Sequence, residues 1–241
     1  MPDKDPSITN DPRVRQAINY SLDREGIVKA AYDGISRPAK DQLITPNVFG
    51  HQADFTAPAY DPDKARQLLK DAGLGGGTKM RVDAQVITFP PAKPILEASI
   101  GLWSAVGIES DVRTIEINIW RDRLYGRETQ GRPGAFFMGW SSFLYEAALA
   151  WQWHASDNPY ALWSNAKFDA ARDEANEAVD PKARMALYRK MAIEERVENG
   201  GPSAFIAENT SAYCLNKTVI DPSSYTAWLN PEILFNEIKP A

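Results

Sequence analysis

Residues 11–25 read Asp11-Pro12-Arg13-Val14-Arg15-Gln16-Ala17-Ile18-Asn19-Tyr20-Ser21-Leu22-Asp23-Arg24-Glu25. Asp11 is placed to cap a helix that begins at Pro12, where the missing N–H of proline costs no hydrogen bond. Asp23 is placed to cap a second helix, which Gly34 ends. The apolar side chains of the first helix share one face, formed by Val14, Ala17 and Ile18. The run therefore predicts two short amphipathic helices in succession.

The same pairing of an aspartate with a proline recurs at Asp61-Pro62. It predicts a third helix, closed by Gly73, whose apolar face is formed by Ala65, Leu68, Leu69 and Ala72. Between the second and third helices, residues 36–59 contain three prolines that interrupt regular helix, Pro38, Pro46 and Pro58. Long ordered loops in compact domains tend to serve function, so this segment is a candidate functional loop.

Strands and helices are predicted to follow one another through the rest of the chain. Residues 79–89 alternate in polarity, which predicts a half-buried strand with Lys79, Arg81, Asp83 and Gln85 on its polar face. Helices are expected over about residues 92–106, 118–124, 167–179 and 181–199, and strands over about 108–117, 134–140, 204–207 and 211–215. Asn118 is expected to cap its helix. This order predicts an α/β lobe with a mixed sheet flanked by helices.

Composition and charge narrow the classes of partner. A chain of 241 residues, with 44% hydrophobic and 24% charged residues, can bury a large core. The net charge of −5 argues against nucleic acid as a partner. Cys214 is the only cysteine, so an intrachain disulfide is excluded and a buried, inert thiol is expected. No apolar run approaches the ~20 residues that span a bilayer, and we expect no signal peptide in this stretch.

The residue types that carry catalytic chemistry give no positive signal for an enzyme. His51 and His154 lie far apart and lack metal-ligand spacing, so no metal or cofactor is predicted, and we expect both in loops. The glycine-rich run 73–79 precedes a strand, whereas a phosphate loop requires a helix there. The run 139–143 begins like a nucleophile elbow but ends in Phe143 instead of glycine.

Large aromatic side chains gather between residues 136 and 163: Phe136, Phe137, Trp140, Phe143, Tyr145, Trp151, Trp153, Tyr160 and Trp163. Several of them must belong to the core. Residues 140–146, however, follow neither a strand nor a helix period. Aromatic walls with a few hydroxyl groups are typical of small-molecule pockets, so this segment is a candidate ligand site.

Six motifs in order resemble one family. Asp11–Arg24 resembles the D-x-R-V-R-Q-A segment of the oligopeptide- and dipeptide-type periplasmic solute-binding proteins of ABC importers, solute-binding protein family 5. Tyr60–Gly73 resembles the family's Y-D-P-x-K-A-x-x-L-L-x-x-A-G segment. Shorter matches follow at Trp103–Ile108, Phe137–Trp140, Asn165–Asp169 and Asp180–Tyr188. Since the first motif lies mid-chain in that family, the resemblance implies the C-terminal lobe of a longer, two-lobed protein.

The resemblance also implies a division of the chain and a set of partners. Residues 1–10 are expected to form a poorly ordered leader, residues 11–214 the second lobe, and residues 215–241 a segment that returns to the first lobe. The whole protein would be a monomeric, non-enzymatic receptor of the periplasm or another extracytoplasmic space. It would close on a peptide or related small solute between its two lobes and deliver it to an ABC permease.

The family pattern G-W-x-x-D, whose aspartate pairs with the ligand's ammonium group, departs here at Phe143. Sugar-like, opine-like, amino-acid-derived or metal-chelate ligands therefore stand beside peptides. Lys93 falls where some members place a cation for the ligand carboxylate. The expected ligand contacts are Trp140, Ser141, Ser142, Phe143, Tyr145, Phe89 and Lys93.

Two other functions remain open at this stage. One is an α/β hydrolase-like enzyme whose reacting group lies in the aromatic region. The other is a peptide-holding chaperone or signalling receptor built on the same fold, which would use the same closing motion as a transport receptor.

Overall fold

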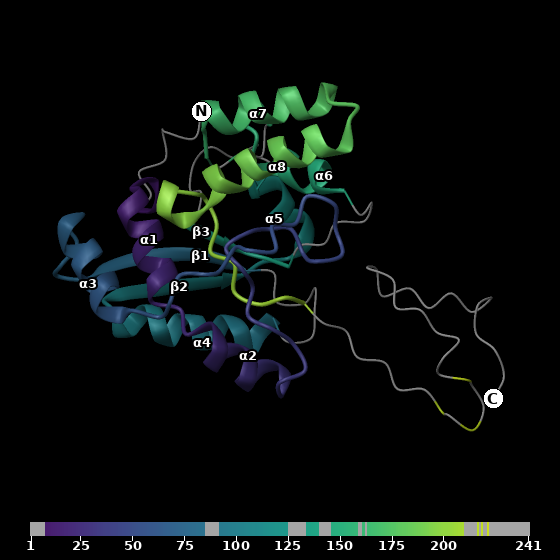
Figure 1. Ribbon diagram of the computed structural model, residues 1–241. Helices are drawn as coiled ribbons and strands as arrows, with labels where there is room; N and C mark the ends of the chain where they lie inside the picture. The colour runs from purple at the N-terminus through teal and green to yellow at the C-terminus, as the bar shows by residue number, and fades with distance from the viewer. Residues whose placement is uncertain are drawn as a thin grey trace.

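The computed structural model describes residues 8–84, 92–124, 134–139, 146–158, 161, 163–209, 216, 218 and 221. Within these residues the chain forms a three-stranded sheet and helices that pack around it (Figure 1). Cys214 and the predicted strand over residues 211–215 lie outside the described residues. None of the described helices has the length and apolarity needed to cross a bilayer.

The three helices predicted from an aspartate and its neighbours are confirmed, and the helix expected from residue 181 begins in the same way. They are α1 (Pro12–Tyr20), α2 (Arg24–Tyr32), α3 (Pro62–Asp71) and α8 (Pro181–Glu195). In each of them, the aspartate before the first residue accepts a hydrogen bond from a backbone N–H of the first turn. The expected starts are therefore set by local hydrogen bonding.

The cap expected at Asn118 was wrong. Helix α5 (Ile117–Leu124) begins one residue earlier, and its cap is the side chain of Glu116. A Glu116 carboxylate oxygen accepts from the backbone N–H of Asn118 at 2.8 Å. The strand before this helix ends at Thr114, which leaves Glu116 free to serve the first turn.

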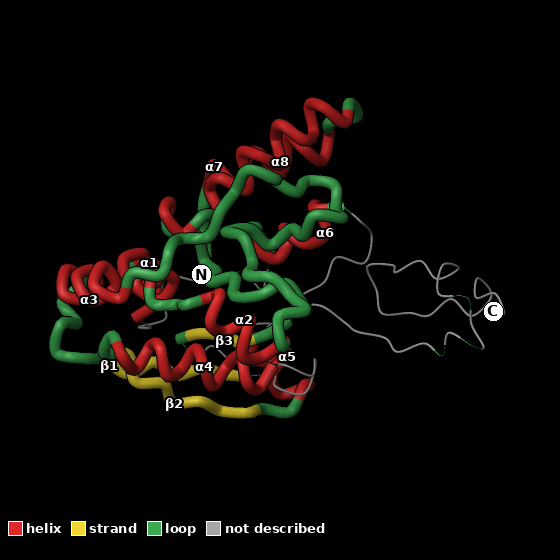
Figure 2. Tube along the Cα trace, turned by 60° about the horizontal axis from the view of Figure 1, so that its bottom comes forward, coloured by secondary structure: helices red, strands yellow, loops and turns green. Residues whose placement is uncertain are grey.

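The sheet has the order β2-β1-β3, with β1 (Thr78–Ala84), β2 (Ile108–Thr114) and β3 (Ala135–Phe137). Both pairings are parallel. The pairing of β1 with β2 begins with Thr78 opposite Ile108, and that of β1 with β3 begins with Val82 opposite Ala135. Figure 2 shows the strands side by side, with α4 (Ala92–Ala105) running along them. The α/β class is confirmed. Beyond the strands, the predicted strand at 204–207 makes a single antiparallel bridge, between Ala207 and Pro38.

The polar face predicted for β1 is interrupted at Asp83, whose side chain is fully buried. As the middle strand of a parallel sheet, β1 is covered on both faces at this point. Asp83 lies 3.0 Å from Arg123 of α5 and 3.6 Å from Arg81. An alternating pattern alone does not reveal a buried carboxylate that has two arginine partners.

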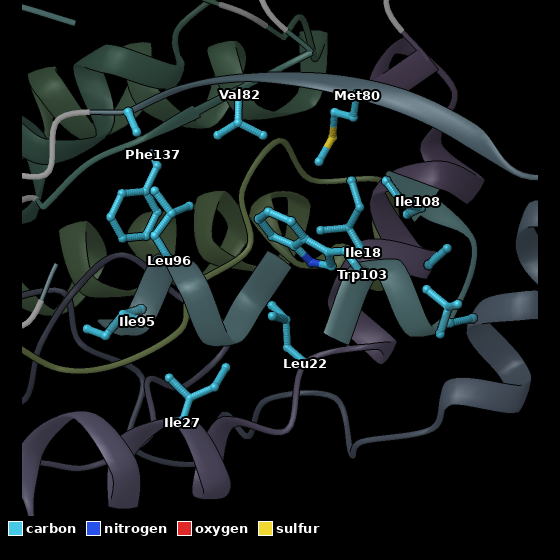
Figure 3. Packing of buried hydrophobic residues seen from close by; sticks show 14 of the residues in the cluster. Ile18, Leu22, Ile27, Met80, Val82, Ile95, Leu96, Trp103, Ile108 and Phe137 are labelled. Atoms are coloured by element: carbon cyan, nitrogen blue, oxygen red, sulfur yellow. The ribbon is translucent and has the colours of Figure 1, made fainter. Parts of the chain in front are cut away.

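The first core lies between the sheet and the helices α1, α2, α3 and α4. Figure 3 shows Met80 and Val82 directed from β1 toward Trp103 of α4. The buried side chains that meet there include Ile18, Leu22, Ile27, Leu69, Met80, Val82, Ile95, Leu96, Trp103, Ile108 and Phe137. This core joins the two N-terminal helices to the sheet.

A second core lies between α7 (Ala166–Glu177), α8 and the short helix α6 (Ala147–Trp151), which was not predicted. Trp151 is fully buried, with its ring centroid 5.3 Å from that of Tyr188. The irregular segment after α2 packs on this core. At Gly50, where φ is +110°, an added Cβ would lie 2.4 Å from the Cβ of Ala147. A side chain at this position would push the loop away from α6.

Leu69→Ala is expected to lower the free energy of unfolding by about 2–5 kcal/mol, because it leaves a cavity at a site that is 2% exposed. Val179→Ala is the control, since that side chain is 87% exposed and its truncation should cost at most about 0.5 kcal/mol. Urea denaturation of both variants measures the difference. Equal losses would contradict the packing described for α3.

Candidate functional site

A cavity of about 400 Å³ lies beside the sheet, where three distant parts of the chain meet. Its walls come from the irregular segment 39–51, from residues 134–139 around β3, and from residues 202–209. Residues 200–209 are called the distal segment below. The volume is in the range of about 300–1,000 Å³ that is usual for small-molecule sites. The cavity is therefore the candidate functional site.

The floor of the cavity is made of first-core side chains: Ile18, Met80, Val82, Ile95, Trp103 and Phe137. Aromatic side chains form much of the remaining wall: Tyr32, Phe136, Trp153, Trp163 and Phe205. Among the aromatic residues singled out in the sequence, Trp151 belongs to the second core instead. A largely apolar, aromatic surface of this kind suits a ligand with an apolar body.

The distal segment is held in place by Arg15 of α1. Its guanidinium donates to four backbone carbonyls, at 2.6 Å to Thr9, 3.0 Å to Asn10, 2.6 Å to Gly200 and 3.1 Å to Gly201. Burial lowers the pKa of Arg15. Because these carbonyls take up the guanidinium N–H groups, Arg15 fixes one wall of the cavity.

Arg24 does the same further along the distal segment. Its Nε donates to the carbonyl of Phe205 at 2.7 Å, and its Nη2 donates to Asn19 Oδ1 at 2.7 Å. Asn19 in turn donates to the carbonyl of Ser203 at 3.3 Å. Burial lowers the pKa of Arg24 to about 10, so it stays protonated at neutral pH. The N-terminal helices therefore position the wall that carries Ser203 and Phe205.

A polar group of three side chains stands at one side of the cavity. His154 belongs to the turn η3 (Gln152–His154), Glu195 is the last residue of α8, and Ser203 lies in the distal segment. His154 Nδ1 is 2.5 Å from Glu195 Oε1, and His154 Nε2 is 3.4 Å from Ser203 Oγ. Trp151 Nε1 donates to the second Glu195 oxygen at 2.9 Å. Glu195 is thus enclosed between an imidazole and an indole.

The contact of His154 Nδ1 with Glu195 Oε1 is close but is not an aligned hydrogen bond. Neither Nδ1 nor Oε1 has a well-aligned hydrogen-bond partner among the described residues. The Glu195 side chain is fully buried, and that of His154 is 16% exposed. Nδ1 therefore faces Glu195, and Nε2 is the ring atom on the Ser203 side.

Asp41 is a second buried carboxylate near this group. It lies 3.4 Å from Arg196, and it accepts from the backbone N–H of Val197 at 3.3 Å. Burial raises its pKa to about 6, while Arg196 and the Val197 N–H oppose the rise and the charge of Glu195 adds to it. Asp41 therefore titrates within a mildly acidic range.

Most of the predicted ligand contacts lie outside the described residues: Trp140, Ser141, Ser142, Phe143, Tyr145 and Phe89. Met138 and Gly139, which directly precede Trp140, line the cavity. Lys93 lies in the first turn of α4, 73% exposed and 3.7 Å from Glu97, and is not among the residues that line the cavity. The predicted contacts stay predictions.

Sequence reasoning missed the group around His154 and the wall formed by the distal segment. Ser203 stands 49 positions from His154, so no local motif links them. The described residues contain no group of three or more His, Cys, Asp or Glu side chains placed to hold a metal ion. The high aromatic content around residue 154 indicated this region of the chain. It gave no indication of Glu195 or Ser203, the polar partners of His154.

Comparison with known proteins assigns the chain to a family. A sequence model of the bacterial extracellular solute-binding proteins, family 5 (middle region), matches residues 3–161. The chain belongs to this family. The similarity expected from the six motifs is thereby confirmed.

Individual relatives agree with this assignment. This chain is 28% identical over 230 residues to the dipeptide-binding protein of Escherichia coli K12. The match covers 88% of this chain and 41% of that protein. It is 29% identical over 191 residues to heme-binding protein A of Haemophilus influenzae, covering 75% of this chain and 34% of that protein. The chain thus spans about 40% of the length of these curated relatives or less.

The fold agrees as well. A periplasmic oligopeptide-binding protein of Borrelia burgdorferi superposes with a TM-score of 0.77 at 19% identity, over 96% of this chain and 46% of that structure. At this identity the likeness concerns the fold alone. These relatives are solute-binding proteins rather than enzymes.

Asp41 is expected to make stability fall as pH rises from about 4 to 6. The pKa of Asp41 is 3.8 in the unfolded chain and about 6 in the folded protein. Between these two pH values the unfolded state binds fewer protons, so the folded state loses stability progressively as pH rises. The loss amounts to as much as about 3 kcal/mol and is constant above this window. Asp41→Asn should remove it. Urea denaturation at several pH values measures the difference, and a pH-independent difference between the two proteins would contradict the assignment.

Proposed function

We propose that this chain is the C-terminal lobe of the substrate-binding component of an ABC importer. The whole protein captures a peptide or related small solute and delivers it to a membrane permease. The observation that carries this proposal is a cavity of about 400 Å³, largely apolar, in a chain of family 5. The dipeptide- and heme-binding relatives support a small solute as the ligand.

The cavity suits capture because its floor and its rim come from different parts of the chain. The floor consists of core side chains that cannot move without disturbing the fold, whereas the rim comes from segments 39–51 and 202–209. A ligand held on this rim can also touch a second lobe. Closure is favoured when the ligand binds the closed form more tightly than the open form.

The remaining parts of the proposal follow the resemblance of the sequence. Residues 1–10 form a leader, residues 11–214 the second lobe, and residues 215–241 return to a first lobe. The receptor works as a monomer in the periplasm or another extracytoplasmic space. Its partners are the first lobe, the solute and the permease, and it catalyses no reaction.

Native mass spectrometry of the complete gene product, purified from its own host, tests the proposal. We expect the protein to carry a small solute that is released on denaturation and can be identified. A co-purified peptide would assign it to peptide capture, and another small molecule would assign it to a related solute. A protein that carries no solute, and binds none from a panel of short peptides, would contradict the proposal.

Trp140→Ala is expected to weaken solute binding by about 10-fold or more, because the resemblance implies that Trp140 contacts the solute and burying a large apolar side chain contributes about 1.5–3 kcal/mol. Tyr60→Ala is the matched control, since Tyr60 is 48% exposed and is not among the residues that line the cavity. Isothermal titration with the co-purified solute measures both variants. An unchanged Kd for Trp140→Ala would remove this residue from the site.

A further inference from the structure

We propose that Arg15 is a positioning residue for closure of the two lobes, because its guanidinium holds the stretch of chain that enters this lobe against the stretch that leaves it. The inference rests on the proposed function, in which a first lobe precedes this one in the chain and residues 215–241 return to it. The turn η2 (Ile8–Asn10) then lies at the entry to this lobe, and the distal segment lies on the way out. The bending that closes two lobes falls on such connecting stretches, so a group that joins them sets how freely the lobes move.

The first argument is the way Arg15 divides its hydrogen bonds. Nη1 donates to the carbonyls of Thr9 and Asn10, at 2.6 and 3.0 Å. Nη2 and Nε donate to the carbonyls of Gly200 and Gly201, at 2.6 and 3.1 Å. One planar group therefore holds both stretches at a fixed spacing, and these four contacts are called the Arg15 clip. A lysine lacks the planar fork that reaches both stretches at once.

The second argument is that the distal segment is shaped to approach Arg15 closely. Gly200 has a φ of +78°, and an added Cβ there would lie 3.2 Å from the Cβ of Pro12. At Gly201 an added Cβ would collide with the carbonyl oxygen of Glu195. Both positions therefore exclude a side chain, and Gly200 also needs the backbone freedom of glycine. Without side chains, the two carbonyls come within reach of the guanidinium.

The third argument is that both stretches are also tied to the body of the lobe. Thr9 Oγ1 donates to the carbonyl of Gly134, directly before β3, at 2.6 Å. On the other side, Gln16 Nε2 of α1 donates to the carbonyl of Val197, just before the distal segment, at 3.2 Å. The entering stretch is thus attached to the sheet and the leaving stretch to α1. Arg15 bonds the two to each other.

The clip acts on closure rather than on the solute. Arg15 lines the cavity, but four carbonyls accept hydrogen bonds from its N–H groups. With both connecting stretches held, the free protein samples fewer orientations of the lobes, and closure around a solute costs less conformational entropy. Loss of the clip therefore weakens binding without removing a contact to the solute.

Arg15→Lys in the complete gene product is the test variant, and Arg13→Lys is the matched control. Arg13 lies on the same helix, and its side chain is 48% exposed. It bonds the Asp11 carboxylate and the carbonyl of Asp71 instead of the two connecting stretches. The two variants therefore make the same chemical change inside and outside the clip.

Hydrogen exchange of the free protein, read by mass spectrometry, tests the clip itself. Arg15→Lys should raise exchange in residues 8–11 and in residues 200–204 together, by about 10-fold or more, since hydrogen bonds to a charged group are lost. Exchange in β1 should stay at the wild-type rate, which shows that the fold is kept. Arg13→Lys should leave both connecting stretches unchanged.

Binding and shape test the link to closure, with leucyl-phenylalanine as the probe. Isothermal titration should give a Kd about 10-fold higher for Arg15→Lys, and a change of less than about 3-fold for Arg13→Lys. Small-angle X-ray scattering should give free Arg15→Lys a larger radius of gyration than the free wild type. At saturating probe the two radii should be equal, because the closed form is the same.

The other outcomes overturn the proposal in distinguishable ways. Unchanged exchange in Arg15→Lys, or a rise in only one stretch, would refute the clip, and a higher Kd with unchanged exchange would assign Arg15 to direct contact with the solute. Raised exchange with an unchanged Kd would separate the clip from closure. In these cases the inference fails while capture of the solute stands. If the wild type does not bind the probe, the capture of peptides and the inference fail together.

A measurement on the wild type decides the case in which Arg15→Lys does not fold. Hydrogen exchange of the free protein is followed at low, rising concentrations of urea. The clip expects residues 8–11 and 200–204 to open in one step, because one guanidinium holds both. Opening of the two stretches at separate urea concentrations would overturn the proposal.

Discussion

The cavity depends on two guanidinium groups, that of the half-buried Arg15 and that of the buried Arg24. Arg15 bonds the carbonyls of Gly200 and Gly201, and Arg24 bonds the carbonyl of Phe205. A charged group is costly to bury unless its donors are satisfied, and here the distal segment supplies several of the acceptors. The requirement is mutual, because carbonyls without a regular strand partner also need donors. Both arginines lie in the sequence run that carries the family's first motif, so that run positions a wall of the site as well as starting two helices.

This attachment brings the two cores into one site. The first core carries the sheet and the floor of the cavity, while the second core carries α6, α7 and α8. The distal segment follows α8 and packs on α1, so it spans the space between the cores. His154 and Glu195 come from the side of the second core, and Ser203 comes from the distal segment. The polar side of the cavity therefore exists only when both cores are folded and in contact.

The sequence predicted what is local in this fold. Caps at Asp11, Asp23 and Asp61 act within the next few residues, so each of these helix starts could be read from a short run. The parallel order of the strands and the burial of Asp83 depend on neighbours distant in the chain, and the alternating pattern missed the latter. The same holds for the site. His154 meets Glu195 and Ser203 only because the packing of α8 and the distal segment brings them together, and no spacing in the sequence encodes that meeting.

The division between floor and rim bears on how one fold can serve different solutes. Met80, Val82 and Trp103 line the floor and also belong to the first core, so truncating one of them would cost about 2–5 kcal/mol of stability. Their identity is constrained by folding, whatever the solute. Segment 39–51 places Ile44 and Val48 in the second core, but segment 202–209 contains no helix or strand and none of its side chains is buried. The side chains of segment 202–209 can therefore vary at a smaller cost to the fold. Selectivity can therefore change at the rim while the apolar floor is kept. The relatives that bind dipeptides and heme are consistent with this division, since they share the family but differ in the ligand.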